Sequence, residues 1–156
     1  MSREIKYNKE ARKKLKVGAD KLANTVKVTL GAKGRNVIMQ QSYGSPYVTK
    51  DGVTVANNIE LPDPIENMGA EMVREAASRA AKDAGDGTTT STILAQALIG
   101  ESLKVLDNPS LLKKVLGKNL INPMDLKRGI DKGVTAVVQR LSELSEEVSH
   151  DNDRIK

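Results

Sequence analysis

The chain has 156 residues, with 25 Lys and Arg against 20 Asp and Glu, a formal net charge of +5, and 38% hydrophobic residues. One domain with a sizeable core is expected at this length. Cysteine is absent and His150 is the only histidine, which excludes disulfides and thiolate or histidine-cluster metal sites. No apolar run reaches the roughly 18 residues of a membrane span, and no secretory signal is recognisable. We therefore expect a soluble protein of a reducing compartment with no membrane partner.

Positive charge is concentrated in the N-terminal third of the chain. Residues 1–60 carry 12 basic and 5 acidic side chains, a net charge of +7. Such a segment suits phosphates or nucleic acid, but it is equally typical of solvated helix faces, which we prefer. With only three Tyr and no Phe or Trp, the chain offers few rings for base stacking.

The first elements are a helix and a hairpin. Residues 8–30 carry apolar side chains at three- and four-residue spacing, which predicts a long amphipathic helix that stops at Gly31. A basic, turn-rich loop follows over residues 31–36. Two short strand-like runs, 37–40 and 47–49, flank a Gly- and Pro-containing turn and predict a β-hairpin closed by Asp51-Gly52.

The next two helices have clear starts. Asp63 is placed to N-cap a helix that has Pro64 at its first position and Glu66 in a capping box. The apolar stripe expected for this helix consists of Ile65, Met68, Met72, Ala76 and Ala80. After Gly85-Asp86-Gly87, three threonines open another helix, whose residues 92–99 are small or apolar on nearly all sides and are expected deep in the core.

The rest of the chain is also expected to be helical. Residues 110–121 predict a short basic amphipathic helix after the break at Asp107-Asn108-Pro109. Asn122 caps a last helix with Asp125 in its first turn. The apolar stripe of this last helix is Ile130, Val134, Val137, Leu141, Leu144 and Val148. The pattern predicts a mainly α fold with a small β-hairpin.

The strongest chemical signal is the run Gly85-Asp86-Gly87-Thr88-Thr89-Thr90 before a helix. A helix N-terminus presents unpaired N–H groups and a partial positive charge, glycines permit close approach, and hydroxyls add donors. Asp86 could hold a Mg²⁺ that bridges phosphates. A plain threonine N-cap explains the same run, so the sequence leaves phosphate binding as one of two interpretations.

Two other segments are weaker candidates. The glycine-spaced basic run 31–35 suits a phosphate site or the GXXG loop of a KH RNA-binding module, although a glycine helix stop with a solvated turn is the preferred interpretation. Asp51 is a candidate second carboxylate for water or metal, and as a turn residue beside glycine it has a simpler explanation. No Walker A pattern is present.

Taken together, five ordered motifs resemble the group I chaperonins of the GroEL type. The motifs are VKVTLGAKGRNV from Val26, TKDGVTVA from Thr49, ENMGA from Glu66, AGDGTTT from Ala84 and NPMDLKRG from Asn122. The resemblance covers residues 3–106 and 122–144. It implies that residues 1–143 form the N-terminal half of a multihelical equatorial, ATP-binding domain, with an insertion at about 107–119. Residues 144–156 would then begin an intermediate domain.

The resemblance also implies an ATP site with Mg²⁺, and K⁺ as a further candidate ion. Asp51 matches a catalytic carboxylate, and Asp86 matches the magnesium ligand. The other nucleotide-binding positions implied are Thr29, Leu30, Gly31, Ala32, Lys50, Gly87, Thr88, Thr89 and Thr90. Ala32 departs from the family, which usually has Pro there, so the loop loses a fixed φ.

For the whole protein, the resemblance implies ATP-driven refolding of non-native proteins inside a homo-oligomeric, seven-membered ring with a co-chaperonin lid. The N-terminal strand near Ile5 and the 37–49 hairpin resemble segments that pair with neighbouring subunits. Full-length relatives are ATPases, whereas the 156 residues alone lack much of the pocket and are expected to hydrolyse no ATP measurably. We expect a bacterial cytoplasmic location, with an organelle matrix or stroma as the alternative. The runner-up function is a basic helical module that binds nucleic acid through residues 3–35, a partner we do not favour.

Overall fold

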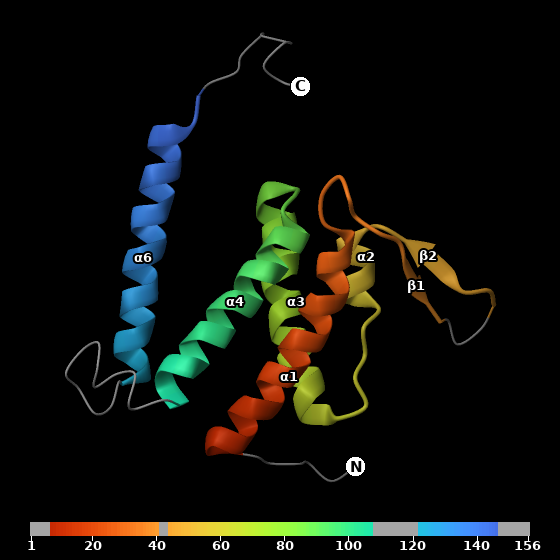
Figure 1. The fold of residues 1–156 in the computed structure, drawn as a ribbon, viewed down its shortest axis with the longest axis horizontal. Helices are drawn as coiled ribbons and strands as arrows, with labels where there is room; N and C mark the ends of the chain where they lie inside the picture. The colour runs from red at the N-terminus through yellow and green to blue at the C-terminus, as the bar shows by residue number, and fades with distance from the viewer. Residues whose placement is uncertain (1–6, 41–43, 108–121, 147–156) are drawn as a thin grey trace. The chain divides into compact units, whose positions relative to one another are not determined.

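A computed structural model describes residues 7–40, 44–107 and 122–146, and these residues are mainly helical with one small sheet (Figure 1). The helices are α1 (Asn8–Val26), α2 (Gly52–Asn57), α3 (Pro64–Ala84), α4 (Thr88–Asp107) and α6 (Pro123–Leu144). A 3₁₀ turn, η1 (Lys27–Thr29), follows α1, and strands β1 (Val37–Met39) and β2 (Tyr47–Thr49) form the hairpin. The mainly α fold with a β-hairpin is thereby confirmed.

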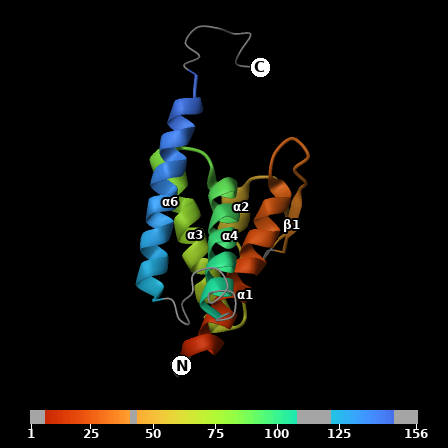
Figure 2. The same ribbon diagram turned by 60° about the vertical axis from the view of Figure 1, so that its left-hand side comes forward.

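The chain divides into two compact units, residues 1–107 and 108–156. In the first unit α1 packs along α3, and α4 packs against both of them, as Figures 1 and 2 show. The core of this unit is made of small and medium-sized apolar side chains from α1, α2 and α3. Its buried members are Ala19, Leu22, Val26, Val55, Ala56, Ala70 and Val73.

Two glycines bring the main chains of α1 and α3 unusually close together. A Cβ built on Gly18 would lie 1.7 Å from the carbonyl oxygen of Glu66, and one built on Gly69 would lie 2.0 Å from that of Leu15. No side chain larger than hydrogen fits at either position. Ion pairs between the helices flank the crossing, one joining Lys14 to Asp63 and one joining Lys21 to Glu66 at 2.5 Å.

The buried face of α3 differs from the expected stripe. The side chains of Met68 and Met72 are 46% and 62% exposed, whereas Gly69, Val73 and Ala77 are buried. The prediction is confirmed for Ile65, which is buried, and wrong for the two methionines, because the close crossing at Gly18 and Gly69 brings the main chains together and leaves no room for long side chains there. The cap was predicted correctly, since the Asp63 carboxylate accepts from the amides of Ile65 and Glu66. Glu66 does not complete a capping box here, because its carboxylate pairs with Lys21.

The expectation that residues 92–99 lie deep in the core is confirmed only in part, since Thr92 is fully buried and Ala95 and Ile99 pack against the core. Leu94 and Leu98 are 58% and 47% exposed, and the buried residues of α4 are Thr88 and Thr92. Among the described residues, α4 contacts α1, α3, η1 and α2, and these contacts leave Leu94 and Leu98 exposed. In the second unit α6 begins, as predicted, at a cap whose Asn122 side chain accepts from the Met124 amide. No residue of α6 is buried.

Some expectations fall outside the described residues. These are the strand near Ile5, the helix predicted over 110–121, the insertion at about 107–119 beyond Asp107, and the residues after 146. The expected helix over 8–30 ends at Val26 and tightens into η1 before Gly31, which adopts a left-handed φ of 70°. Helix α2 was not predicted. Among the described residues, none of the helices combines the length and the apolar character of a membrane span.

Candidate functional site

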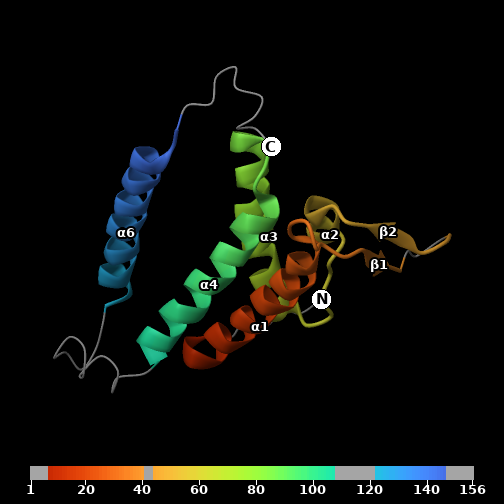
Figure 3. The ribbon, with the colours of Figure 1, turned by 45° about the horizontal axis from the view of Figure 1, so that its top comes forward.

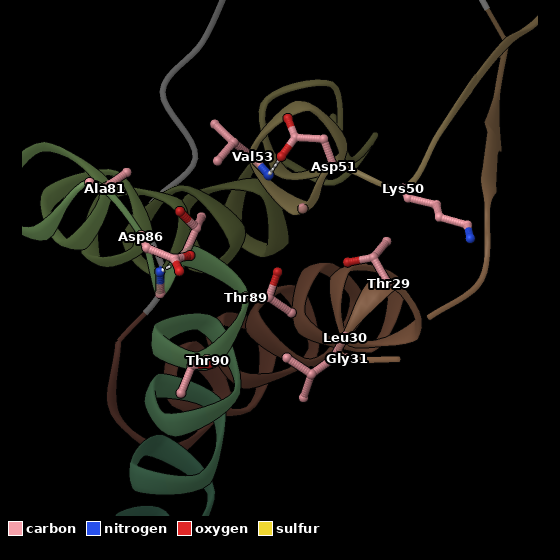
Figure 4. Close-up of a pocket in the computed structure, with 14 residues that line it drawn as sticks. Thr29, Leu30, Gly31, Lys50, Asp51, Val53, Ala81, Asp86, Thr89 and Thr90 are labelled. Carbon is pink, nitrogen blue, oxygen red and sulfur yellow. Dashed lines mark hydrogen bonds between the residues drawn. The ribbon is translucent and has the colours of Figure 1, made fainter. Parts of the chain in front are cut away.

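Three segments that are distant in the sequence line one cavity of about 310 Å³ (Figure 4). The first is the end of η1 with the residues after it, the second joins β2 to α2, and the third joins α3 to α4. Figure 3 shows how the ends of α1, α2, α3 and α4 come together on this side of the first unit. The lining residues are Thr29, Leu30, Gly31, Lys50, Asp51, Gly52, Val53, Ala81, Gly85, Asp86, Gly87, Thr88, Thr89 and Thr90.

The N-terminus of α4 forms one wall of the cavity. Gly85 ends α3 in the left-handed region with φ 73°, and Gly87 has φ 84°, so both positions favour glycine. The amide of Ser91 donates to the carbonyl oxygen of Gly87 at 2.8 Å and closes the first turn of α4. The amides before Ser91 have no acceptor within the helix, and together with the helix dipole they favour an anion in the cavity.

Asp86 stands between the two glycines and is exposed. Its Oδ1 accepts from the Gly87 amide at 2.6 Å, which directs the carboxylate across the start of α4. Within the described residues, no group of three or more His, Cys, Asp or Glu side chains could enclose a metal ion. A cation at Asp86 would therefore take its remaining ligands from phosphate and water, the arrangement that Mg²⁺ commonly adopts with nucleotides.

Asp51 lies across the cavity and N-caps α2. Its carboxylate accepts from the amides of Val53 at 3.3 Å and Thr54 at 2.9 Å, and from the Thr54 hydroxyl at 2.5 Å. The Thr54 hydroxyl and amide hold the pKa of Asp51 below its usual value. Asp51 is therefore ionised at neutral pH and can accept further hydrogen bonds from water or a ligand.

Gly52 joins the Asp51 wall to the α4 wall. It is buried, and a Cβ built on it would lie 2.2 Å from Oγ1 of Thr89 and 3.4 Å from Oγ1 of Thr29. The first turn of α2 thus meets two threonine hydroxyls with no room for a side chain. All three segments of the cavity converge at this glycine.

The loop after η1 forms the third wall. The Thr29 hydroxyl donates to the carbonyl oxygen of Val26 at 2.8 Å, and the Arg35 amide donates to that of Val28 at 2.7 Å. A Cβ on Gly34 would lie 2.3 Å from the carbonyl oxygen of Thr29, so this glycine allows the loop to fold back on itself. The glycine spacing of residues 31–35 is explained by this local turn.

Of the site residues expected from the sequence, all but Ala32 line the cavity. Four lining residues were not expected, namely Gly52, Val53, Ala81 and Gly85. Gly52 could have been found from the run Asp51-Gly52-Val53-Thr54, because aspartate is a preferred N-cap residue and its amide partners follow two and three residues later. Ala81 carries no signal of its own, because it reaches the cavity only through the packing of α3.

The sequence matches a known protein family, and the fold is similar to that of a solved structure. Residues 22–156 match the TCP-1/cpn60 chaperonin family. The fold is similar to that of the chaperonin gp146 from the bacteriophage EL 2 (Pseudomonas aeruginosa), solved in presence of ATP-BeFx, with a TM-score of 0.70 and 28% sequence identity. The match covers 92% of this chain and 23% of that chain, so the residues here correspond to less than a quarter of that protein.

Proposed function

The chain belongs to the TCP-1/cpn60 chaperonin family, and we propose that it supplies the phosphate- and Mg²⁺-binding part of an ATP site in a protein-folding chaperone. The observation that carries the proposal is the cavity itself. In it, the N-terminus of the long helix α4 and the carboxylate of Asp86 face Asp51 and the Thr29–Gly31 loop. Its volume of about 310 Å³ is at the lower end for ligand pockets, as suits a partial nucleotide site.

Each wall has a defined role in this proposal. The amides and hydroxyls of Thr88, Thr89 and Thr90 bind phosphate oxygens at the start of α4. Asp86 holds Mg²⁺, which neutralises negative charge on the phosphates when it is bound. Residues 29–31, with Ala32 beside them, wrap the nucleotide, and the Lys50 ammonium adds a positive charge at the rim.

Asp51 is proposed as the catalytic carboxylate. Hydrolysis of a terminal phosphate needs a water held in line with the bond that breaks. An ionised carboxylate at the cavity wall can accept a hydrogen bond from that water and orient it. The hydrogen bonds from Thr54 and Val53 fix the direction of the Asp51 side chain, so that the water is held at a defined place.

The function of the whole protein is proposed from the family and from the five motifs. These motifs favour the group I type, and with it a homo-oligomeric ring of seven subunits, a co-chaperonin lid, ATP hydrolysis and non-native protein clients. A requirement for K⁺ and a bacterial cytoplasmic location, with an organelle as the alternative, stay predictions on the same grounds.

The structure gives the nucleic-acid alternative no support. Several lysines of the basic N-terminal segment are engaged within the first unit rather than displayed together. Lys14 pairs with Asp63, Lys16 with Asp20 and Lys21 with Glu66. These ion pairs neutralise three of the lysines that would have to meet phosphates.

Calorimetric titration of the chain with ATP tests the proposal when it is done once in the presence of Mg²⁺ and once in the presence of EDTA. Wild-type chain should bind ATP more tightly with Mg²⁺, and Asp86→Ala should weaken Mg-ATP binding by about tenfold or more, because one metal ligand is lost. Asp83→Ala, an exposed neighbour at the end of α3 that does not line the cavity, is the matched control. Equal Mg²⁺-dependent affinity in Asp86→Ala and wild type would contradict the proposal.

A further inference from the structure

Helix α2 carries Asp51 but is too short to hold its own position. It has six residues, from Gly52 to Asn57, and helices of this length are not stable alone in water. Its direction therefore depends on contacts with the rest of the first unit. Val55 and Ala56 are buried in the core, and Gly52 packs against Thr89 at the N-terminal end.

The C-terminal end of α2 is held by an arginine from α3. Nε of Arg74 donates to the carbonyl oxygen of Ala56 at 2.8 Å, and Nη2 of the same side chain donates to that of Ile59. Arg74 is half-buried where it makes these bonds. The last carbonyl groups of a helix lack intrahelical donors and carry partial negative charge, so a cation there is favourable.

The geometry suits arginine in particular. The planar guanidinium presents several N–H donors in a fixed fork, and here it spans the end of α2 and the segment that follows it. Lysine has a single ammonium on a flexible stem and would not fix both carbonyls in one geometry. Two points of attachment limit rotation of the short helix as well as its displacement.

We propose that Arg74 is a positioning residue for the ATP site: by fixing the C-terminal end of α2, it fixes the place of Asp51 in the cavity. The inference rests on the proposed function, because Asp51 is the group being placed. The contact runs from Arg74 to the Ala56 carbonyl and then, through less than one turn of helix, to the amides of Val53 and Thr54. Those amides donate to the Asp51 carboxylate.

Arg74→Gln removes the charge and the fork, and Arg74→Lys keeps the charge alone. Arg79→Gln is the matched control, since Arg79 lies on the same helix and pairs with Glu75 on its exposed surface. Hydrogen exchange of the Val53 and Thr54 amides and the carboxyl ¹³C shift of Asp51 report on the cap. Asp63, which caps α3, is an internal reference. Calorimetry with Mg-ATP is run on the same samples.

We expect amide exchange at Val53 and Thr54 to be about tenfold faster in Arg74→Gln, or about 1.4 kcal/mol, with an intermediate value in Arg74→Lys. The Asp51 carboxyl shift should move while that of Asp63 does not, and Arg79→Gln should match wild type. Unchanged exchange and an unchanged Asp51 shift in both Arg74 variants would overturn the inference. If Arg74→Gln does not fold, the Lys variant decides by the same two readouts.

The two proposals fail differently. Absence of Mg-ATP binding by the wild-type chain would overturn the proposed function, even with exchange and shift changes that support the Arg74 contact. Normal wild-type binding together with an undisturbed Asp51 in the Arg74 variants would overturn only the role of Arg74.

Discussion

Replacement of Gly52 by alanine tests the point where the three walls of the cavity meet. The added Cβ would lie 2.2 Å from Oγ1 of Thr89 and 3.4 Å from both Oγ1 of Thr29 and Cγ1 of Val26. Contacts below 3.0 Å do not persist, so the Thr89 side chain, α2 or the first turn of α4 has to move. Thr89 is β-branched and has few χ1 rotamers open to it in a helix, so we expect α2 and α4 to separate and Asp51 to move away from the α4 wall.

The magnitude follows from two opposing effects. Overpacking of this kind costs about 1–3 kcal/mol. Alanine in place of glycine in a helix gains about 0.4–1 kcal/mol, because the unfolded chain loses freedom. We expect Gly52→Ala to lower the free energy of unfolding by about 1–2 kcal/mol. Urea unfolding followed by circular dichroism measures this, and calorimetry should show weaker Mg-ATP binding.

A double-mutant cycle separates this clash from a general loss of stability. Thr89→Ala removes the Oγ1 that the new methyl group would meet, so Gly52→Ala should cost less in that background. Gly100→Ala is the matched control on α4, where the nearest atom to a new Cβ is Lys16 Cε at 4.0 Å. That variant should be as stable as wild type or more stable. A Gly52→Ala chain with wild-type stability and wild-type Mg-ATP affinity would refute the reasoning.

Two further variants probe the cap and the helix crossing. Thr54→Val removes the hydroxyl that holds the pKa of Asp51 low, so that pKa should rise toward its usual value in a carboxyl ¹³C titration, while Thr54→Ser keeps it low. Because the pKa of Asp51 is lower in the folded chain than in the unfolded chain, where it is about 3.9, ionised Asp51 stabilises the fold above that pH. This stabilisation is lost as the pH falls through the folded pKa, so Thr54→Val should lose less stability than wild type on acidification. An unchanged Asp51 pKa in Thr54→Val would contradict the hydrogen bond from the Thr54 hydroxyl. Gly69→Ala should lower the free energy of unfolding of the first unit, measured by urea denaturation, by about 3 kcal/mol or more. Its Cβ would lie 2.0 Å from the Leu15 carbonyl oxygen, so the main chain would have to move. A loss below about 1 kcal/mol would contradict the close crossing.

Local signals predicted the starts of elements well. Asp63 and Asn122 were both expected to cap helices, and both accept amide hydrogen bonds there. The hairpin is also present as predicted, and its register, which was not predicted, places Val37 opposite Thr49 and Met39 opposite Tyr47. Each of these features depends on residues that are close in the sequence, where side-chain chemistry and spacing determine the backbone.

Features that depend on distant contacts were missed. Helix α2 contains Val53, Thr54 and Val55, β-branched residues that favour strands, and its helical form is supported by Arg74 and by the core. Hydrophobicity identified Ile65 but not the rest of the buried face of α3, because the close crossing at Gly18 and Gly69 buries a glycine and leaves Met68 and Met72 exposed. At the site, the α4 start was recognisable as a motif, whereas the approach of Gly52 to Thr89 exists only in the folded unit.

That approach of Gly52 to Thr89 also bears on how the unit folds. The walls of the cavity come from segments separated by the hairpin and by the whole of α3, so the cavity is completed only after contacts of long sequence separation have formed. A partly folded chain would have the α4 start without the facing wall. A ligand that bridges the walls would bind the finished unit alone, and by mass action it would stabilise that unit by about 2.7 kcal/mol at a hundredfold excess over its Kd. A nucleotide at the proposed site would then favour chains in which all three segments have assembled over chains in which they have not.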